Sequence, residues 1–170
     1  IGAVLDPDWH YGVNYVSDLG ISSVAASRYL FAFGCIVPSI LAVIYGYICY
    51  REEPDRSRVL SHILLMVGGI LIIGVGLFTE DTPYHLFFAF GFMFMMLFIS
   101  FITFHHLIKD GHRKDSLIQV VLWAIIVMSY PFGLPFLEAN AIIVCLVFLV
   151  WREIFVLQRY YKGDSRLTPG

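Results

Sequence analysis

The chain has 170 residues, of which 59% are hydrophobic and 14% are charged, with a formal net charge of −2 and a mean hydropathy of +0.78. A soluble domain of this size usually carries about a quarter charged residues. The slightly acidic balance excludes a basic nucleic-acid surface, so we expect no nucleic-acid partner. The composition predicts an all-α fold, in which residues 1–170 form a single integral membrane domain built as a bundle of transmembrane helices.

Five apolar segments are long enough, or nearly so, to cross a bilayer as helices, which takes about 20 residues each. An outer loop over residues 1–23 precedes them, and the predicted spans cover about 24–50, 59–78, 83–108, 117–130 and 136–157, followed by a tail at 158–170. The fourth segment is short and ends in a proline-containing loop, which lipid-exposed backbone could not form. Because residues 1–5 are apolar like the end of a helix, we expect a sixth span upstream.

The basic residues are unevenly distributed over the connecting segments. Ten of the 11 Lys and Arg residues lie in segments 51–58 and 109–115 or in the stretch from Arg152 onward, and Arg28 is the exception. With five spans, these three regions fall on one side, which the positive-inside rule places in the cytoplasm. We therefore predict a multi-pass protein of the cell (plasma) membrane with a cytoplasmic C-terminus.

Polar side chains gather near the predicted outer ends of the spans, where ionisable groups are costly in lipid and normally face the protein interior. The candidates are Asp18, Glu80, Asp81, His85 and Glu138. His85 lies in the first turn of the third span, where the helix dipole disfavours imidazolium. A neutral imidazole is what a general base or a metal ligand requires.

Two kinds of chemistry fit these residues. In a catalytic site, His85 would act as the base or ligand, with Asp18 and Glu138 as acids. In a metal site, His85, Asp81 and Glu80 would bind a divalent ion, although nothing in the sequence requires a cofactor.

Structural roles fit the same residues. His85 and Asp81 would tie loop ends together by hydrogen bonds. Asp18 would form a turn with Gly20 and pair with Arg28. Glu138 would be favoured by the dipole of the helix that it begins.

Three motifs, in order and over nearly the whole chain, resemble elements of the domain-of-unknown-function 998 family of prokaryotic polytopic membrane proteins. They are Tyr15–Gly20 (YVSDLG), the glycine-rich stretch from Gly68 to Glu80 that ends in GVGLFTE and is followed by His85, and Gly133–Glu138 (GLPFLE). The chain departs from the family pattern at Thr79, where proline is expected, and at Phe136, where leucine is more usual.

The resemblance implies a six-helix bundle but no reaction. It singles out Ser17, Asp18, Glu80, His85 and Glu138. A weaker likeness to GPI-lipid-remodelling and DRAM-type membrane proteins implies a connection with lipids by analogy only.

Two functions from different classes follow. The first is a non-catalytic accessory or structural subunit of a membrane complex, with membrane lipids and other membrane-protein subunits as partners. The alternative is a membrane-embedded hydrolase, transferase or binding protein for lipids or lipid-linked substrates, with a histidine–carboxylate site at the outer face. Convergence of His85 and carboxylates on one cavity would favour the alternative.

Overall fold

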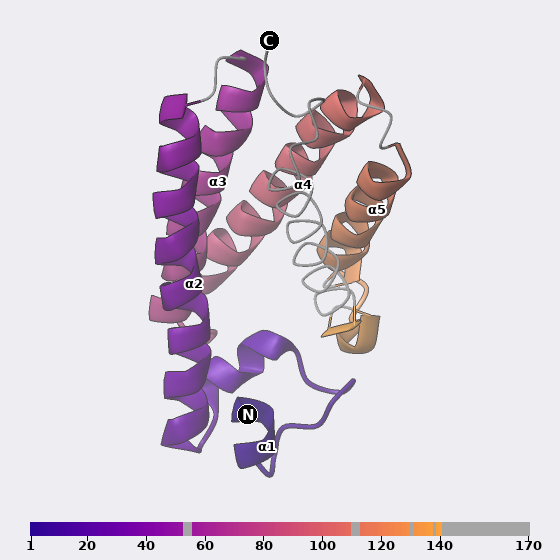
Figure 1. The fold of residues 1–170 in the computed structure, drawn as a ribbon. Coiled ribbons are helices and arrows are strands. Elements are labelled where there is room, and N and C mark those ends of the chain that lie inside the picture. Colours follow the sequence, from indigo (N-terminus) through magenta and orange to yellow (C-terminus); the bar gives the residue numbers. More distant parts are fainter. Residues whose placement is uncertain (53–55, 110–112, 130, 138, 141–170) are drawn as a thin grey trace.

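The computed structural model describes residues 1–52, 56–109, 113–129, 131–137 and 139–140, and within these ranges every regular element is helical. The elements are α1 (Gly2–Leu5), the 3-10 helix η1 (Val16–Ile21), α2 (Ala25–Glu52), α3 (Arg56–Leu77), α4 (His85–Lys109) and α5 (Arg113–Ser129). Each long helix packs against the next one in the chain, and α1 and η1 lie at one end of α2 (Figure 1). The predicted all-α fold is confirmed for this part of the chain.

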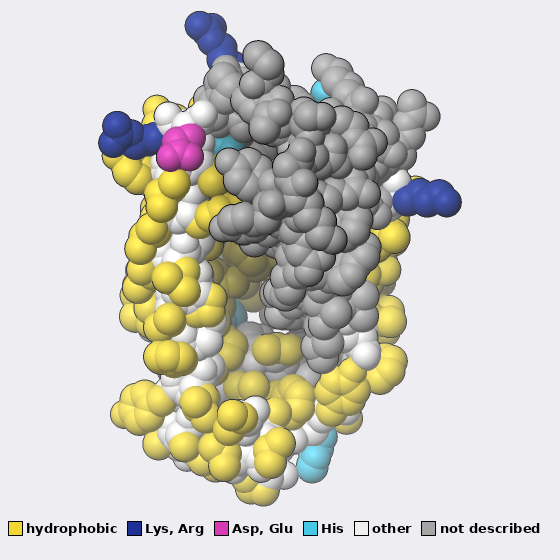
Figure 2. All heavy atoms as spheres, in the orientation of Figure 1, with side chains coloured by type: hydrophobic (Ala, Val, Ile, Leu, Met, Phe, Trp, Pro, Cys, Tyr) yellow, Lys and Arg dark blue, Asp and Glu magenta, His cyan; other side chains and the backbone are white. Residues whose placement is uncertain are grey.

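Two of the helices are long and apolar enough to cross a membrane. They are α2, with a mean hydropathy of 2.0, and Val59–Leu77 of α3, with 2.3. Large hydrophobic side chains cover the outside of α2, where Phe33 and Leu41 are each 62% exposed, and Figure 2 shows this surface as almost continuously hydrophobic. A helix that exposes so much apolar surface is consistent with a membrane protein, since such a surface is unfavourable in water.

The observed helices differ from the predicted spans mainly at their ends. Helix α4 begins at His85 instead of residue 83, because residues 79–84 form a turn in which Thr82 Oγ1 donates to the Thr79 carbonyl at 2.8 Å. Helix α5 begins at Arg113, before the predicted 117. The predicted fifth span beyond residue 140 and the tail at 158–170 lie outside the described residues, so the count of five spans stays a prediction.

Glycines on α3 bring its backbone close to α2. A Cβ atom at Gly69 would lie 2.7 Å from Val43 Cγ2, and one at Gly76 would lie 2.9 Å from Cys35 Cβ. Both distances are shorter than carbon atoms tolerate, so any larger residue would push the helices apart. Small residues in membrane helices allow this close packing and the dispersion contacts that come with it.

The segments predicted to share one side of the membrane meet at one end of the bundle. Ser27 is fully buried and its hydroxyl donates to the Gly2 carbonyl at 2.8 Å, which fixes the N-terminal segment to α2. Tyr11 packs edge-on against Phe136, with ring centroids 5.8 Å apart. The Ser17 hydroxyl of η1 donates a hydrogen bond to Glu80 in the α3–α4 connection. The last turn of α2 and the first turn of α3 lie at the opposite end (Figure 1).

We predict that Gly76→Leu destabilises the protein by about 1–3 kcal/mol, because the added side chain must displace the backbone of α2. The measurement is unfolding of the full chain in detergent. Gly34→Ala is the matched control, since no described atom lies within 4 Å of a Cβ at Gly34 and alanine favours the helix by about 1 kcal/mol. Equal destabilisation by both substitutions would contradict the packing account.

Candidate functional site

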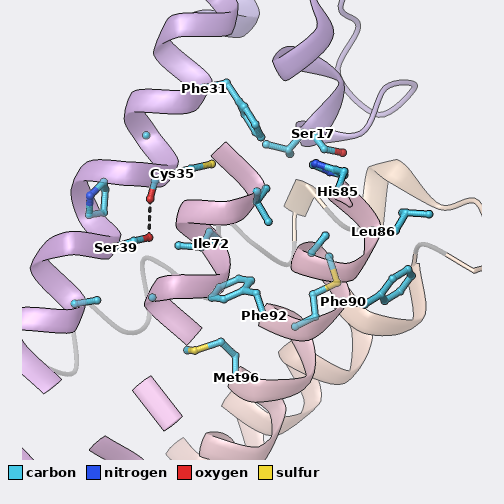
Figure 3. A pocket seen from close by; sticks show the side chains of 18 of the residues that line it. Ser17, Phe31, Cys35, Ser39, Ile72, His85, Leu86, Phe90, Phe92 and Met96 are labelled. Carbon is cyan, nitrogen blue, oxygen red and sulfur yellow. Dashed lines mark hydrogen bonds between the residues drawn. The ribbon is translucent and has the colours of Figure 1, made fainter. Parts of the chain in front are cut away.

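A cavity of about 430 Å³ lies between α2, α3 and α4 and reaches η1 at one end (Figure 3). Its volume is within the usual range for ligand pockets of about 300–1,000 Å³. The walls are mostly apolar, and they include Phe31, Ala42, Ile72, Phe92 and Met96. Such a lining favours an apolar guest over water.

Three polar side chains from three different elements meet at the η1 end of this cavity. Ser17 comes from η1, Glu80 from the α3–α4 connection, and His85 is the first residue of α4. Ser17 Oγ donates to Glu80 Oε1 at 2.8 Å. Figure 3 shows Ser17 and His85 at this end and Met96 at the other, so the cavity is polar at one end and apolar along its length. We call Ser17, Glu80 and His85 the polar corner.

The orientation of the His85 ring is fixed by the end of α3. His85 is 2% exposed, and its Nδ1 lies 2.7 Å from the carbonyl oxygen of Phe78. A carbonyl can only accept, so Nδ1 carries the hydrogen, and in the neutral ring Nε2 is left as an acceptor. The Phe78 ring stacks on Phe88 with centroids 5.2 Å apart, and the Phe78 N–H donates to the Gly74 carbonyl at 2.8 Å. The imidazole is therefore held by a well-anchored partner.

Asp18 and Glu80 form a pair of carboxyl groups beside the cavity. Asp18 Oδ2 accepts from the backbone N–H of Tyr15 at 2.9 Å, which holds it in η1. The pKa of Glu80 is raised to about 7, first by burial and then by the hydrogen bond and the negative charge of Asp18, while the Ser17 hydroxyl acts in the opposite direction. Burial and the neighbouring Asp18 carboxyl group therefore favour the protonated form of Glu80.

The structure brings together only some of the predicted site residues. His85 and Glu80 line the cavity and Asp18 adjoins it, whereas Asp81 is exposed and accepts a hydrogen bond from the Thr79 hydroxyl. Glu138 lies outside the described residues.

The predicted metal set of His85, Asp81 and Glu80 is not assembled. Within the described ranges, no three His, Cys, Asp or Glu residues are placed to hold a metal ion. The Asp81 carboxylate is hydrogen-bonded to the Thr79 hydroxyl instead. The Nδ1 atom of His85 is hydrogen-bonded to the Phe78 carbonyl, so it is not available as a metal ligand. The predicted Arg28–Asp18 pairing is also wrong, because Arg28 Nη1 donates to the Ser22 carbonyl.

Two residues that line the cavity, Gly34 and Pro38, were not among the predicted site residues. Pro38 lies inside α2, and it lines the cavity together with Gly34, one turn earlier. Because proline has no N–H, the Gly34 carbonyl loses its helical donor. The sequence signal for this unpaired carbonyl is a proline four residues after a glycine within an apolar span.

The chain belongs to the DUF998 family of proteins of unknown function, whose family model matches residues 1–154. The family resemblance expected from the three motifs is thereby confirmed. Neither the curated proteins nor the solved structures contain a match to this chain. The family description names no reaction.

We predict that Glu80→Gln flattens the pH dependence of stability. Folding raises the pKa of Glu80 from 4.5 to about 7, so the folded protein binds the proton more tightly than the unfolded chain does. The resulting stabilisation is complete below the unfolded pKa and is lost as the pH rises through about 7. The unfolding midpoint in detergent should therefore fall less for the variant than for wild type between about pH 5 and about pH 8.

Asp81→Asn is the control for this experiment, because Asp81 is exposed and does not line the cavity. It should keep the pH dependence of the wild type. Identical pH profiles for Glu80→Gln and wild type would refute the raised pKa of Glu80.

Proposed function

We propose that this DUF998 protein is a multi-pass membrane protein that binds one lipid or lipid-linked molecule, with the apolar chain in the cavity and the polar group at the polar corner. The observation that carries the proposal is the cavity itself, which is apolar along its length and polar at one end. An amphiphile likewise has a long apolar chain and a polar group at one end. Burial of its chain is favourable by about 25 cal/mol for each Å² removed from water, and the polar group sets its position.

The position of the cavity supports entry of a lipid from the bilayer. Gly34 and Pro38 line it and are exposed on α2, a helix long and apolar enough to cross a membrane. A guest molecule could therefore enter sideways between helices without passing through water. Figure 2 shows a hollow beside the hydrophobic surface of α2.

The proposal includes an orientation in the membrane. The basic segment 51–58 and the basic C-terminal region would lie in the cytoplasm, and the polar corner would lie at the outer leaflet of the plasma membrane. Two observations support this orientation. Ten of the 11 Lys and Arg residues fall in the predicted cytoplasmic regions. At one end of the bundle, the N-terminal segment contacts both the α3–α4 connection and Phe136.

A non-catalytic accessory subunit remains a second proposal. The exposed apolar side chains of α2 would suit partner helices as well as lipid tails. The native mass of the protein, extracted in mild detergent, tests it, because a subunit should migrate within a larger assembly. Catalysis by His85 as base, with Asp18 and Glu138 as acids, also stays a prediction, and lipid binding does not depend on it.

We predict that Gly34→Phe abolishes lipid retention. The new ring would occupy space that no described atom fills, so it should block the cavity while leaving the packing of α2 intact. Leu41→Phe is the matched control, since Leu41 is on the same helix but 62% exposed and absent from the cavity wall.

The measurement is native mass spectrometry of lipid that stays bound after purification. We expect bound lipid on wild type and Leu41→Phe, and loss of at least about tenfold for Gly34→Phe, equivalent to about 1.4 kcal/mol. Equal retention by all three proteins would contradict the proposal.

A further inference from the structure

We propose that the ligand's head group is a hydrogen-bond donor, an amine or a hydroxyl, and not a carboxylate or phosphate, because the cavity presents acceptors to its guest and almost no free donors. This inference rests on the proposed lipid binding and names the class of lipid. It follows from the direction of each hydrogen bond around the cavity.

The acceptors come from the polar corner. With its Nδ1 hydrogen committed to the Phe78 carbonyl, the His85 ring in its neutral form offers the lone pair of Nε2. Glu80 offers carboxyl oxygens. Gly34, whose carbonyl loses its helical donor because Pro38 lacks an N–H, is also a lining residue.

The two hydroxyl hydrogens of the wall are already committed. The Ser17 hydroxyl donates to Glu80 at 2.8 Å, and the Ser39 hydroxyl donates to the Cys35 carbonyl at 2.6 Å. Trp123 also lines the cavity, and its indole N–H has no hydrogen-bond partner among the described residues, although neighbouring atoms cover the nitrogen. A guest that only accepts hydrogen bonds would leave the wall acceptors unpaired, which is costly when they are buried.

The charge of the cavity favours the same class of head group. Among the described residues, no Lys or Arg lines the cavity, while the Asp18–Glu80 pair places negative charge at its end. An anionic head group would meet like charge without a compensating cation. An ammonium group would form a charge-assisted hydrogen bond with the pair, and a hydroxyl would form a neutral one.

The experiment compares three probes that share one chain and differ in head group: dodecylamine, dodecanol and dodecanoate. Each is added to the full chain in lipid nanodiscs at a pH above about 7, where dodecanoate is ionised. The readout is the shift of the unfolding midpoint, since a ligand that binds only the folded state raises it. Gly34→Phe serves in parallel to separate binding in the cavity from effects on the bilayer.

For wild type we expect dodecylamine and dodecanol to raise the midpoint and dodecanoate to leave it unchanged. Glu80→Gln should weaken dodecylamine binding by about tenfold or more, as expected for loss of a charged hydrogen bond. Asp81→Asn, which removes an exposed carboxylate outside the cavity, should bind all three probes as wild type does.

The outcomes separate the two proposals. If dodecanoate stabilises wild type as strongly as dodecylamine and Gly34→Phe abolishes both effects, the cavity binds lipid and the head-group inference is overturned. If no probe acts differently on wild type and Gly34→Phe, the proposed function fails and the inference fails with it. The wild-type series alone decides the head group, so the conclusion does not depend on the folding of Glu80→Gln.

Discussion

The hydrogen bond from Ser17 Oγ to Glu80 Oε1 joins segments that are 63 residues apart and closes one end of the cavity. It brings η1 onto the connection between α3 and α4, and with it Asp18 comes beside Glu80. The close packing of α2 on α3 at Gly69 and Gly76 holds together two of the helices that line it.

Burying a carboxyl group in an apolar wall is expensive, and the protein reduces this cost in two ways. Glu80 accepts a hydrogen bond from Ser17, and its pKa is raised to about 7, so it loses its proton less readily than an ordinary glutamate does. His85 is buried with its Nδ1 hydrogen satisfied by a backbone carbonyl. The hydrogen-bonding positions that Glu80 and His85 leave unused are thus acceptors, which is the chemical basis for a ligand that carries a hydrogen-bond donor.

The long helices could be predicted from the length of the apolar segments, because a membrane helix needs little more than about 20 apolar residues. The glycines of α3 are where the backbones approach, and His85, Glu80 and Asp18 do gather at one end. The role of Asp81 could not be predicted, since a neighbouring hydroxyl, Thr79, decides where its side chain turns. The part played by Ser17 depends on a contact between distant segments, which spacing along the chain cannot reveal.

The central claim is that an apolar chain occupies the space between α2, α3 and α4. The most direct test is photo-crosslinking of the full chain in bilayers with a lipid that carries a diazirine in its acyl chain, followed by peptide mapping. The account predicts labels on cavity-lining positions such as Ala42, Phe92 and Met93, in excess of those on the outward positions Leu41 and Ile44. Labels confined to the outward positions would show that lipid surrounds the protein without entering it, and would contradict the account.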